Sequence, residues 1–129
     1  MAKEWTFKCF KSSSGTNKIR KWLNALPEDD QAKIDATIKQ LEIEKKLEDP
    51  PVKKLTGYKY LFEIKIKSGG VQYRPIGYYG PNRKEFTILI GVIKKERKLK
   101  PTNAYATACD RIKLIDKDKE GHTIGYWTT

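Results

Sequence analysis

Apolar and polar residues near the N-terminus first alternate and then change to a longer period. In residues 5–10, WTFKCF, the alternation is typical of a short half-buried strand. A helical spacing follows, in which apolar residues recur every three or four positions: Ile19, Trp22, Leu23 and Leu26. The chain is therefore predicted to begin with a strand and an amphipathic helix.

A second helix is predicted directly after Pro27. Proline lacks the N–H that a helix interior needs, so it either ends the first helix or opens the next one. Three acidic residues follow at 28–30, where they favour the positive end of the helix dipole. The apolar stripe of this helix consists of Ile34, Ile38 and Leu41.

Three strands are predicted in the middle of the chain, after a linker at residues 49–57. Residues 62–67 alternate between apolar and charged, and the turn that follows makes residues 71–79 their hairpin partner. Pro75 cannot donate to a sheet, so it implies a bulge or a local edge. Residues 85–93 are almost continuously apolar, which favours a central strand covered on both faces.

A last helix is predicted after Pro101, with small and apolar residues at near-helical spacing: Ala104, Ala108, Ile112 and Ile115. The tail from about residue 115 has no assignable pattern. The predicted order is βααβββα, which indicates one α+β domain over residues 1–129. The first strand has no hairpin partner nearby, so we expect it to join the sheet beside a later strand.

Composition limits the setting in which the protein acts. The chain has 129 residues, 38% of them hydrophobic and 33% charged, which suits one domain with a modest core. Cys9 and Cys109 lack metal-ligand spacing and are too few for a disulfide framework. The N-terminal segment lacks the apolar region of a secretion signal, and the longest apolar run is too short to cross a bilayer. We therefore expect a cytoplasmic protein with no membrane partner.

Positive charge is concentrated in the second half of the chain. Residues 53–100 contain 13 Lys or Arg and 3 Asp or Glu, so they hold nearly all of the chain's net charge of +11. Residues 28–49 are acidic, with eight Asp or Glu against four Lys, and we expect them on a different part of the molecule. Basic residues set on strands suit a polyanion held against a rigid surface, and nucleic acid is the usual polyanion.

The order of four motifs resembles a known family. KKLTG (residues 53–57) is followed by LFEIKI (61–66), YRPIGYY (73–79) and TILIGVIKKERK (87–98). In this order they resemble the RelE/HigB superfamily of type II toxin–antitoxin toxins, and most of all its phage-derived HigB-like branch. The resemblance extends from about Trp5 to about Arg111.

The resemblance implies a fold, an activity and partners. The fold is a small twisted antiparallel sheet with two N-terminal helices packed on one side and a C-terminal helix. The activity is that of a ribosome-dependent endoribonuclease, an mRNA interferase that cuts mRNA in the ribosomal A site and inhibits translation without a metal or other cofactor. The partners are the ribosome, mRNA and a cognate antitoxin, expected to be a helix-turn-helix DNA-binding protein.

The resemblance also assigns roles to individual residues. The catalytic residues that it implies lie on or just after the three middle strands: Lys65, Arg74, Lys94, Lys95 and Arg97. The resemblance also points to Tyr105 as an RNA-binding residue. Three basic residues near the catalytic ones are predicted to bind RNA as well: Lys53, Lys54 and Lys98.

RNA cleavage by attack of the 2′-hydroxyl needs a charged group at the phosphate and groups that move two protons. The guanidinium of Arg74 is planar and permanently charged, so it suits the phosphate. A lysine among other cations has a lowered pKa, which makes Lys65 or Lys95 a possible base or acid. His122, the only histidine, lies in the glycine-flanked tail and is expected to be solvated.

Three readings of the basic segment stay open at the level of sequence. The first is the nuclease. The second is a non-catalytic RNA- or DNA-binding module, such as a degenerate prophage toxin. The third is a docking site for an acidic partner peptide. In a purely structural reading, Arg74 pairs with Glu63 across the hairpin.

Overall fold

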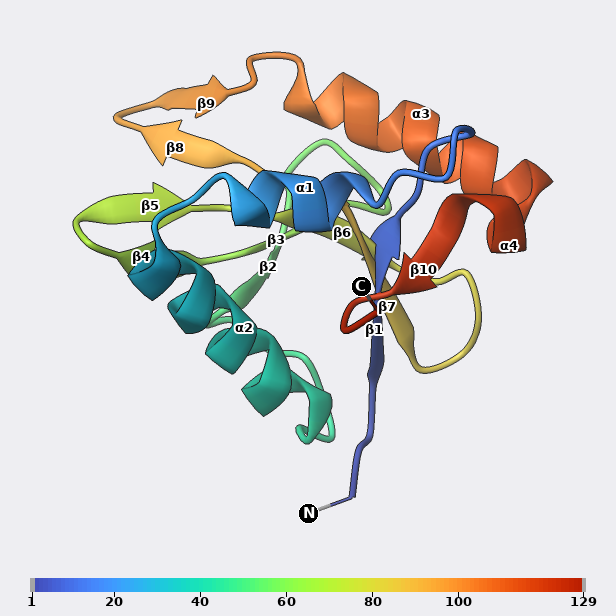
Figure 1. Ribbon diagram of the computed structural model, residues 1–129, viewed down its shortest axis with the longest axis horizontal. Coiled ribbons are helices and arrows are strands. Elements are labelled where there is room, and N and C mark those ends of the chain that lie inside the picture. Colours follow the sequence, from blue (N-terminus) through green and yellow to red (C-terminus); the bar gives the residue numbers. More distant parts are fainter. Residues whose placement is uncertain (1, 129) are drawn as a thin grey trace.

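The computed structural model describes residues 2–128, so both ends of the predicted 1–129 domain lie outside the described part. Within it the chain forms four helices (Figure 1): α1 Lys18–Asn24, α2 Glu28–Glu42, α3 Ala104–Lys117 and α4 Lys119–His122. The described part of the chain also contains ten strands: β1 Thr6–Phe10, β2 Val52–Lys54, β3 Phe62–Ile64, β4 Ile66–Ser68, β5 Val71–Tyr73, β6 Ile76–Tyr79, β7 Glu85–Ile90, β8 Ile93–Lys95, β9 Lys98–Lys100 and β10 Thr123–Gly125. The class is α+β. No helix in this part of the chain has the length and apolar character that a membrane span requires.

The strands belong to two sheets. The larger sheet has six strands in the order β10-β1-β7-β6-β3-β2, and the smaller has four in the order β4-β5-β8-β9. β1 runs parallel to β7, with Phe7 opposite Phe86, whereas the other neighbours are antiparallel. The expectation that the first strand joins beside a later one is confirmed, and the larger sheet is mixed.

The predicted small antiparallel sheet and the order βααβββα are wrong. Each of the three predicted middle strands breaks and continues in the other sheet: at Lys65, at Arg74 and Pro75, and at Gly91 and Val92. The predicted linker contains β2, and the unassigned tail contains α4 and β10. Hydrophobic periodicity detects extended chain, but it does not show where that chain bends from one sheet into another.

Backbone hydrogen bonds show that the bends lie side by side. Each bend is joined to a neighbouring segment: Lys65 N–H donates to Pro51 C=O at 2.8 Å, Ile64 N–H to Pro75 C=O at 2.9 Å, and Arg74 N–H to Val92 C=O at 2.7 Å. Because Pro75 has no N–H to donate, it fits the position at which its strand leaves the ladder. The two sheets therefore meet along one line of bends.

Two apolar cores cover opposite faces of the larger sheet. One lies against α1 and α2 and includes Phe7, Ile19, Leu23, Ile34, Ile38 and Phe86. The other lies against α3 and includes Ile76, Tyr78, Leu89, Ala104, Ala108 and Ile115. In Figure 1, α3 accordingly lies at the top and α2 at the lower left, with strands between them.

Gly91, at the third bend, lets helix α1 approach the sheet closely. A Cβ atom at this position would overlap the ring of Trp22. That ring packs edge-on against the buried ring of Tyr73, with 6.0 Å between centroids. The bend and the helix therefore fit together only when residue 91 has no side chain.

Asp30 joins α2 to the smaller sheet. Its buried carboxylate accepts hydrogen bonds from Ser68 Oγ, at 2.5 Å to Oδ1, and from the Tyr73 hydroxyl. The hydrogen bonds from Ser68 and Tyr73 lower the pKa of Asp30 below its usual range. Burial, followed by the hydrogen bond to Asp30, raises the pKa of Tyr73 to about 12.

The tail completes the larger sheet. β10 pairs with β1, and Tyr126 after it is fully buried. The Tyr126 hydroxyl donates to Asp35 Oδ1 at 2.7 Å, and Arg20 Nη2 donates to the Tyr126 carbonyl at 3.0 Å. The guanidinium of Arg20 also lies 4.9 Å from the centre of the Tyr126 ring. The segment without a sequence pattern is therefore held by α1, α2 and β1.

Gly91→Ala should lower the free energy of unfolding by about 1–3 kcal/mol, because the added methyl group overpacks the Trp22 ring. Urea unfolding measures the loss. The matched experiment repeats Gly91→Ala in a Trp22→Leu background, where the penalty should shrink. An equal penalty in both backgrounds would show that the strain lies in the backbone.

Asp30→Asn should destabilise the fold at pH 7, and the loss should shrink as the pH falls below 4. The lowered pKa means that the stability contributed by ionised Asp30 is present above about pH 4 and is lost as the pH falls through that pKa. Unfolding curves at several pH values measure the difference, with the exposed neighbour Asp29→Asn as the control. If the difference in unfolding free energy between the wild type and Asp30→Asn did not vary with pH, the ionised carboxylate of Asp30 would not be what stabilises the fold.

Candidate nucleic-acid interface

Strand register gathers several predicted residues on one face of the smaller sheet. Lys67 lies opposite Gln72, and Gln72 lies opposite Lys94, so these three side chains share a face. Ile64 and Ile66 pack into the core beside α1 and α2, which turns Lys65 between them to the same side as Lys67. Arg74 belongs to this side because its Nη2 donates to Gln72 Oε1 at 2.7 Å. We call Lys65, Lys67, Gln72, Arg74 and Lys94 the basic face.

The basic face is open to solvent, whereas the reverse of the sheet is packed. On the reverse, Ile66, Tyr73 and Ile93 lie in register and contact the core of α1 and α2. On the basic face, Lys67 and Gln72 are exposed and Lys94 is partly exposed. A charged, uncovered sheet face with a rigid packed back suits an extended polyanion.

The β8–β9 hairpin separates the predicted basic residues into two groups. Lys95 pairs with Lys98, and the alternation of side chains places Lys95 on the face opposite Lys94. Arg97 is exposed in the turn, next to Glu96 with φ 57°. The structure therefore brings Lys65, Arg74 and Lys94 together and leaves Lys95, Arg97 and Lys98 outside the basic face.

Lys65 has an anionic partner within the protein. Its Nζ lies 2.7 Å from Asp49 Oδ1, and the two side chains are 33% and 47% exposed. Asp49 belongs to the acidic segment that was expected elsewhere, so the end of that segment reaches the basic face. An ion pair this exposed contributes about 0–1 kcal/mol, which a polyanion can offset.

Arg74 is held by its own strand. Besides its bond to Gln72, Nη1 donates to the Tyr73 carbonyl at 3.2 Å. Arg74 makes these contacts instead of the pairing with Glu63 that the structural hypothesis predicted. Nε is buried and has no hydrogen-bond partner among the described residues, so this donor is unsatisfied inside the protein.

An acid and two tyrosines adjoin the basic face beside the first turn of α3. Glu63 is only 7% exposed and lies opposite Lys53 and Ile76 in the larger sheet. The ring of Tyr105 packs edge-on against Tyr58, with 5.0 Å between centroids. Burial, and then the charge of Glu63, raise the pKa of Tyr105. The sequence suggested Glu63 only as a structural partner of Arg74, although a lone acid in a strand was a usable signal of a functional residue.

The lysines of β2 differ in what they contact. Lys54 Nζ donates to the carbonyls of Tyr58 and Lys59, at 3.1 Å each. Lys53 is exposed at the sheet edge opposite Glu63. Of the two predicted RNA-binding lysines, Lys54 therefore stabilises a loop, whereas Lys53 remains available.

His122 has a structural position. Its Nδ1 lies 3.1 Å from the Lys11 carbonyl, and its ring stacks on Phe10 with 5.8 Å between centroids. The expectation of a solvated histidine is wrong, because the side chain is partly buried between these neighbours.

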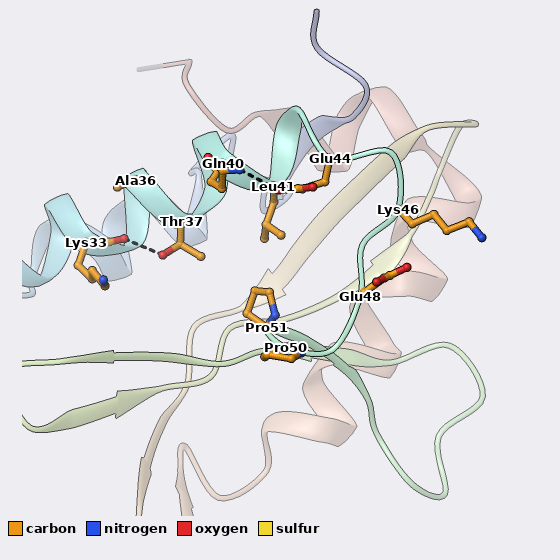
Figure 2. A pocket seen from close by; sticks show the side chains of 10 residues that line it. All are labelled: Lys33, Ala36, Thr37, Gln40, Leu41, Glu44, Lys46, Glu48, Pro50 and Pro51. Carbon is orange, nitrogen blue, oxygen red and sulfur yellow. Dashed lines mark hydrogen bonds between the residues drawn. The ribbon is translucent and has the colours of Figure 1, made fainter. Parts of the chain in front are cut away.

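The groove in Figure 2 lies between α2 and residues 44–51, with a volume of about 440 Å³. Its side chains carry both signs of charge, with Lys33 and Lys46 against Glu44 and Glu48. No residue of the basic face lines it. The groove therefore lies on the α2 side and does not include the basic face. Residues 2–128 also contain no group of three or more His, Cys, Asp or Glu arranged to hold a metal ion.

Residues 21–113 match the family described as phage derived protein Gp49-like (DUF891). The chain belongs to this family. It is a toxin-like family of the RelE/HigB type, so the resemblance is confirmed at that level. The matched range contains the whole basic face and Tyr105, whereas β1 and β10 lie outside it. No curated protein and no solved structure shows significant similarity to the chain.

Glu63→Gln should lower the pKa of Tyr105, because a tyrosinate there would no longer face a carboxylate. The pKa should stay above that of free tyrosine, since burial is the larger cause. NMR titration of ring-labelled tyrosines measures it, and Tyr105→Phe identifies the signal. An unchanged pKa would place the Glu63 carboxylate too far away to act on Tyr105.

Proposed function

We propose that this Gp49-like protein is the toxin of a type II toxin–antitoxin system and cuts mRNA in the ribosomal A site. Membership of a toxin-like family supports a toxin in general. The observation that carries the nuclease proposal is the convergence of Lys65, Arg74 and Lys94 from three chain segments onto one open face. Such a face binds a phosphate backbone without a metal.

In the proposed reaction, the 2′-oxygen attacks the adjacent phosphorus and the bond to the 5′-oxygen breaks. Arg74 and Lys94, which lie on the same face as Gln72, neutralise the charge that develops on the phosphate. One preorganised contact of this kind contributes about 3–4 kcal/mol to stabilising the transition state.

Two proton transfers complete the proposed reaction. Glu63 accepts the proton of the 2′-hydroxyl, and Lys65 supplies a proton to the leaving 5′-oxygen. The two residues are two positions apart on one side of the chain, about 7 Å at the rise of a strand, which leaves room for a phosphate between them. Lys95, the other lysine that the sequence suggested, lies on the opposite face.

The proposed partners follow from this activity. The substrate is mRNA and the ribosome is the partner that presents it, so the proposed site of action is the cytoplasm. The cognate antitoxin is expected to be a helix-turn-helix protein, as the resemblance to HigB-like toxins implies. It neutralises the toxin by covering the basic face with an acidic or amphipathic segment.

A non-catalytic RNA-binding module is the alternative. The observation that favours it is the contact between Lys65 and Asp49, because an ammonium held by a carboxylate of the protein is less available to the RNA. A degenerate toxin would keep the basic face, and with it RNA binding, but would have lost cleavage.

Arg74→Ala should reduce mRNA cleavage in a translating bacterial extract by about 100- to 1000-fold, since it removes the main phosphate ligand. Primer extension maps the cuts, with and without an inhibitor of ribosome loading. Lys95→Ala removes an equal charge from the opposite face and should leave the cleavage nearly unchanged.

Translation-dependent cuts in coding regions that vanish only in Arg74→Ala would establish the nuclease and its site. A folded wild-type protein that binds RNA without cutting it would establish the binding module instead. Equal losses in Arg74→Ala and Lys95→Ala would contradict the assignment of the basic face.

A further inference from the structure

The loop between β2 and β3, residues 55–61, presents an aromatic ring to solvent. Tyr60 in this loop is 57% exposed, more than the other exposed large apolar side chains of the described chain: Trp127, Tyr79 and Leu114. We call residues 55–61 the tyrosine loop. The neighbouring Leu55 and Leu61 are buried, so the loop is anchored at both ends while Tyr60 points outward.

The loop is held in shape. Leu55 N–H donates to the Leu61 carbonyl at 2.9 Å, and Tyr58 N–H donates to the Leu55 carbonyl at 3.3 Å. The ammonium of Lys54 binds two further carbonyls of the loop, those of Tyr58 and Lys59. A ring presented on a loop with this many contacts loses little conformational entropy when it binds a ligand.

The other exposed aromatic rings are used within the fold. Trp127 Nε1 donates to Glu42 at 3.0 Å. Tyr79 packs against Phe62 and Phe86, at 4.8 and 5.3 Å between centroids. The neighbour of Tyr60 is instead a cation, since Lys59 Nζ lies 5.4 Å from the centre of its ring. An exposed ring with a cation beside it is the combination that binds single-stranded nucleic acid, through base stacking and a phosphate contact.

The tyrosine loop is next to the candidate interface. Tyr58 in the loop packs on Tyr105, whose pKa responds to Glu63. From the end of the loop, three residues of β3 lead directly to Lys65, a distance of roughly 10–14 Å at the rise of a strand. One short RNA segment can therefore contact both the tyrosine loop and the basic face.

We propose that the tyrosine loop is a base-stacking subsite for single-stranded RNA, with a base on the Tyr60 ring and Lys59 at its phosphate. Only the choice of mRNA as the strand rests on the proposed function. Stacking itself requires no cleavage, because the ring and the cation are present whether or not the protein is a nuclease.

The test measures binding of a short single-stranded RNA containing 2-aminopurine, at one fixed salt concentration. Tyr60→Ala should weaken binding by about 5- to 150-fold, the range that corresponds to the loss of one stacked base. Tyr60→Trp, which keeps an aromatic ring at this position, should bind as tightly as the wild type and should quench the fluorescence of the stacked 2-aminopurine. Leu114→Ala, which removes another exposed apolar side chain from α3, should leave binding unchanged.

Thermal unfolding is the second measurement, and Tyr60→Ala should not change it because the ring is exposed. Equal affinity of the wild type and Tyr60→Ala would overturn the subsite, whether or not the wild type cuts mRNA. Conversely, a wild type that cuts no mRNA but loses RNA affinity in Tyr60→Ala would refute the nuclease and keep the subsite. The two proposals therefore fail separately.

Discussion

The close approach of Trp22 to Gly91 is the constraint on which the arrangement of the sheets depends. Because residue 91 has no side chain, α1 lies directly on the bend between β7 and β8. The bends at Lys65 and at Arg74 are hydrogen-bonded beside it, so the three middle segments turn along one line. One side of the smaller sheet that results is packed against α1 and α2 through Ile66, Tyr73 and Ile93. Its other side is the basic face.

Helices α1, α2 and α3 and the main basic residues were predictable, because their signals are local. Acidic residues at 28–30 and the stripe from Ile34 to Leu41 specify α2 without reference to the rest of the chain. The bends were not predictable, since an extended run looks the same whether it stays in one sheet or crosses into another. The tail was missed for a related reason. Tyr126 is buried by α1, α2 and β1, which lie about a hundred residues earlier.

Adjacent basic residues could not be ranked from the sequence. Lys94 and Lys95 are neighbours in a strand and so must point to opposite faces. Which of them joins Arg74 depends on the register with Gln72, a long-range fact. Net charge also overstated the number of lysines that are available to a ligand. Lys54 and Lys65 count toward the basic segment, yet one binds backbone carbonyls and the other a carboxylate.

The pairing of β1 has a consequence for the order in which the molecule is built. Phe7 and Cys9 leave the ribosome first, but the strands beside them consist of residues 85–90 and 123–125. During most of synthesis these buried side chains therefore have no sheet to enter, and long-range pairings of this kind form slowly. A nascent chain of this protein therefore exposes β1 to chaperones and proteases until β7 and β10 have been translated.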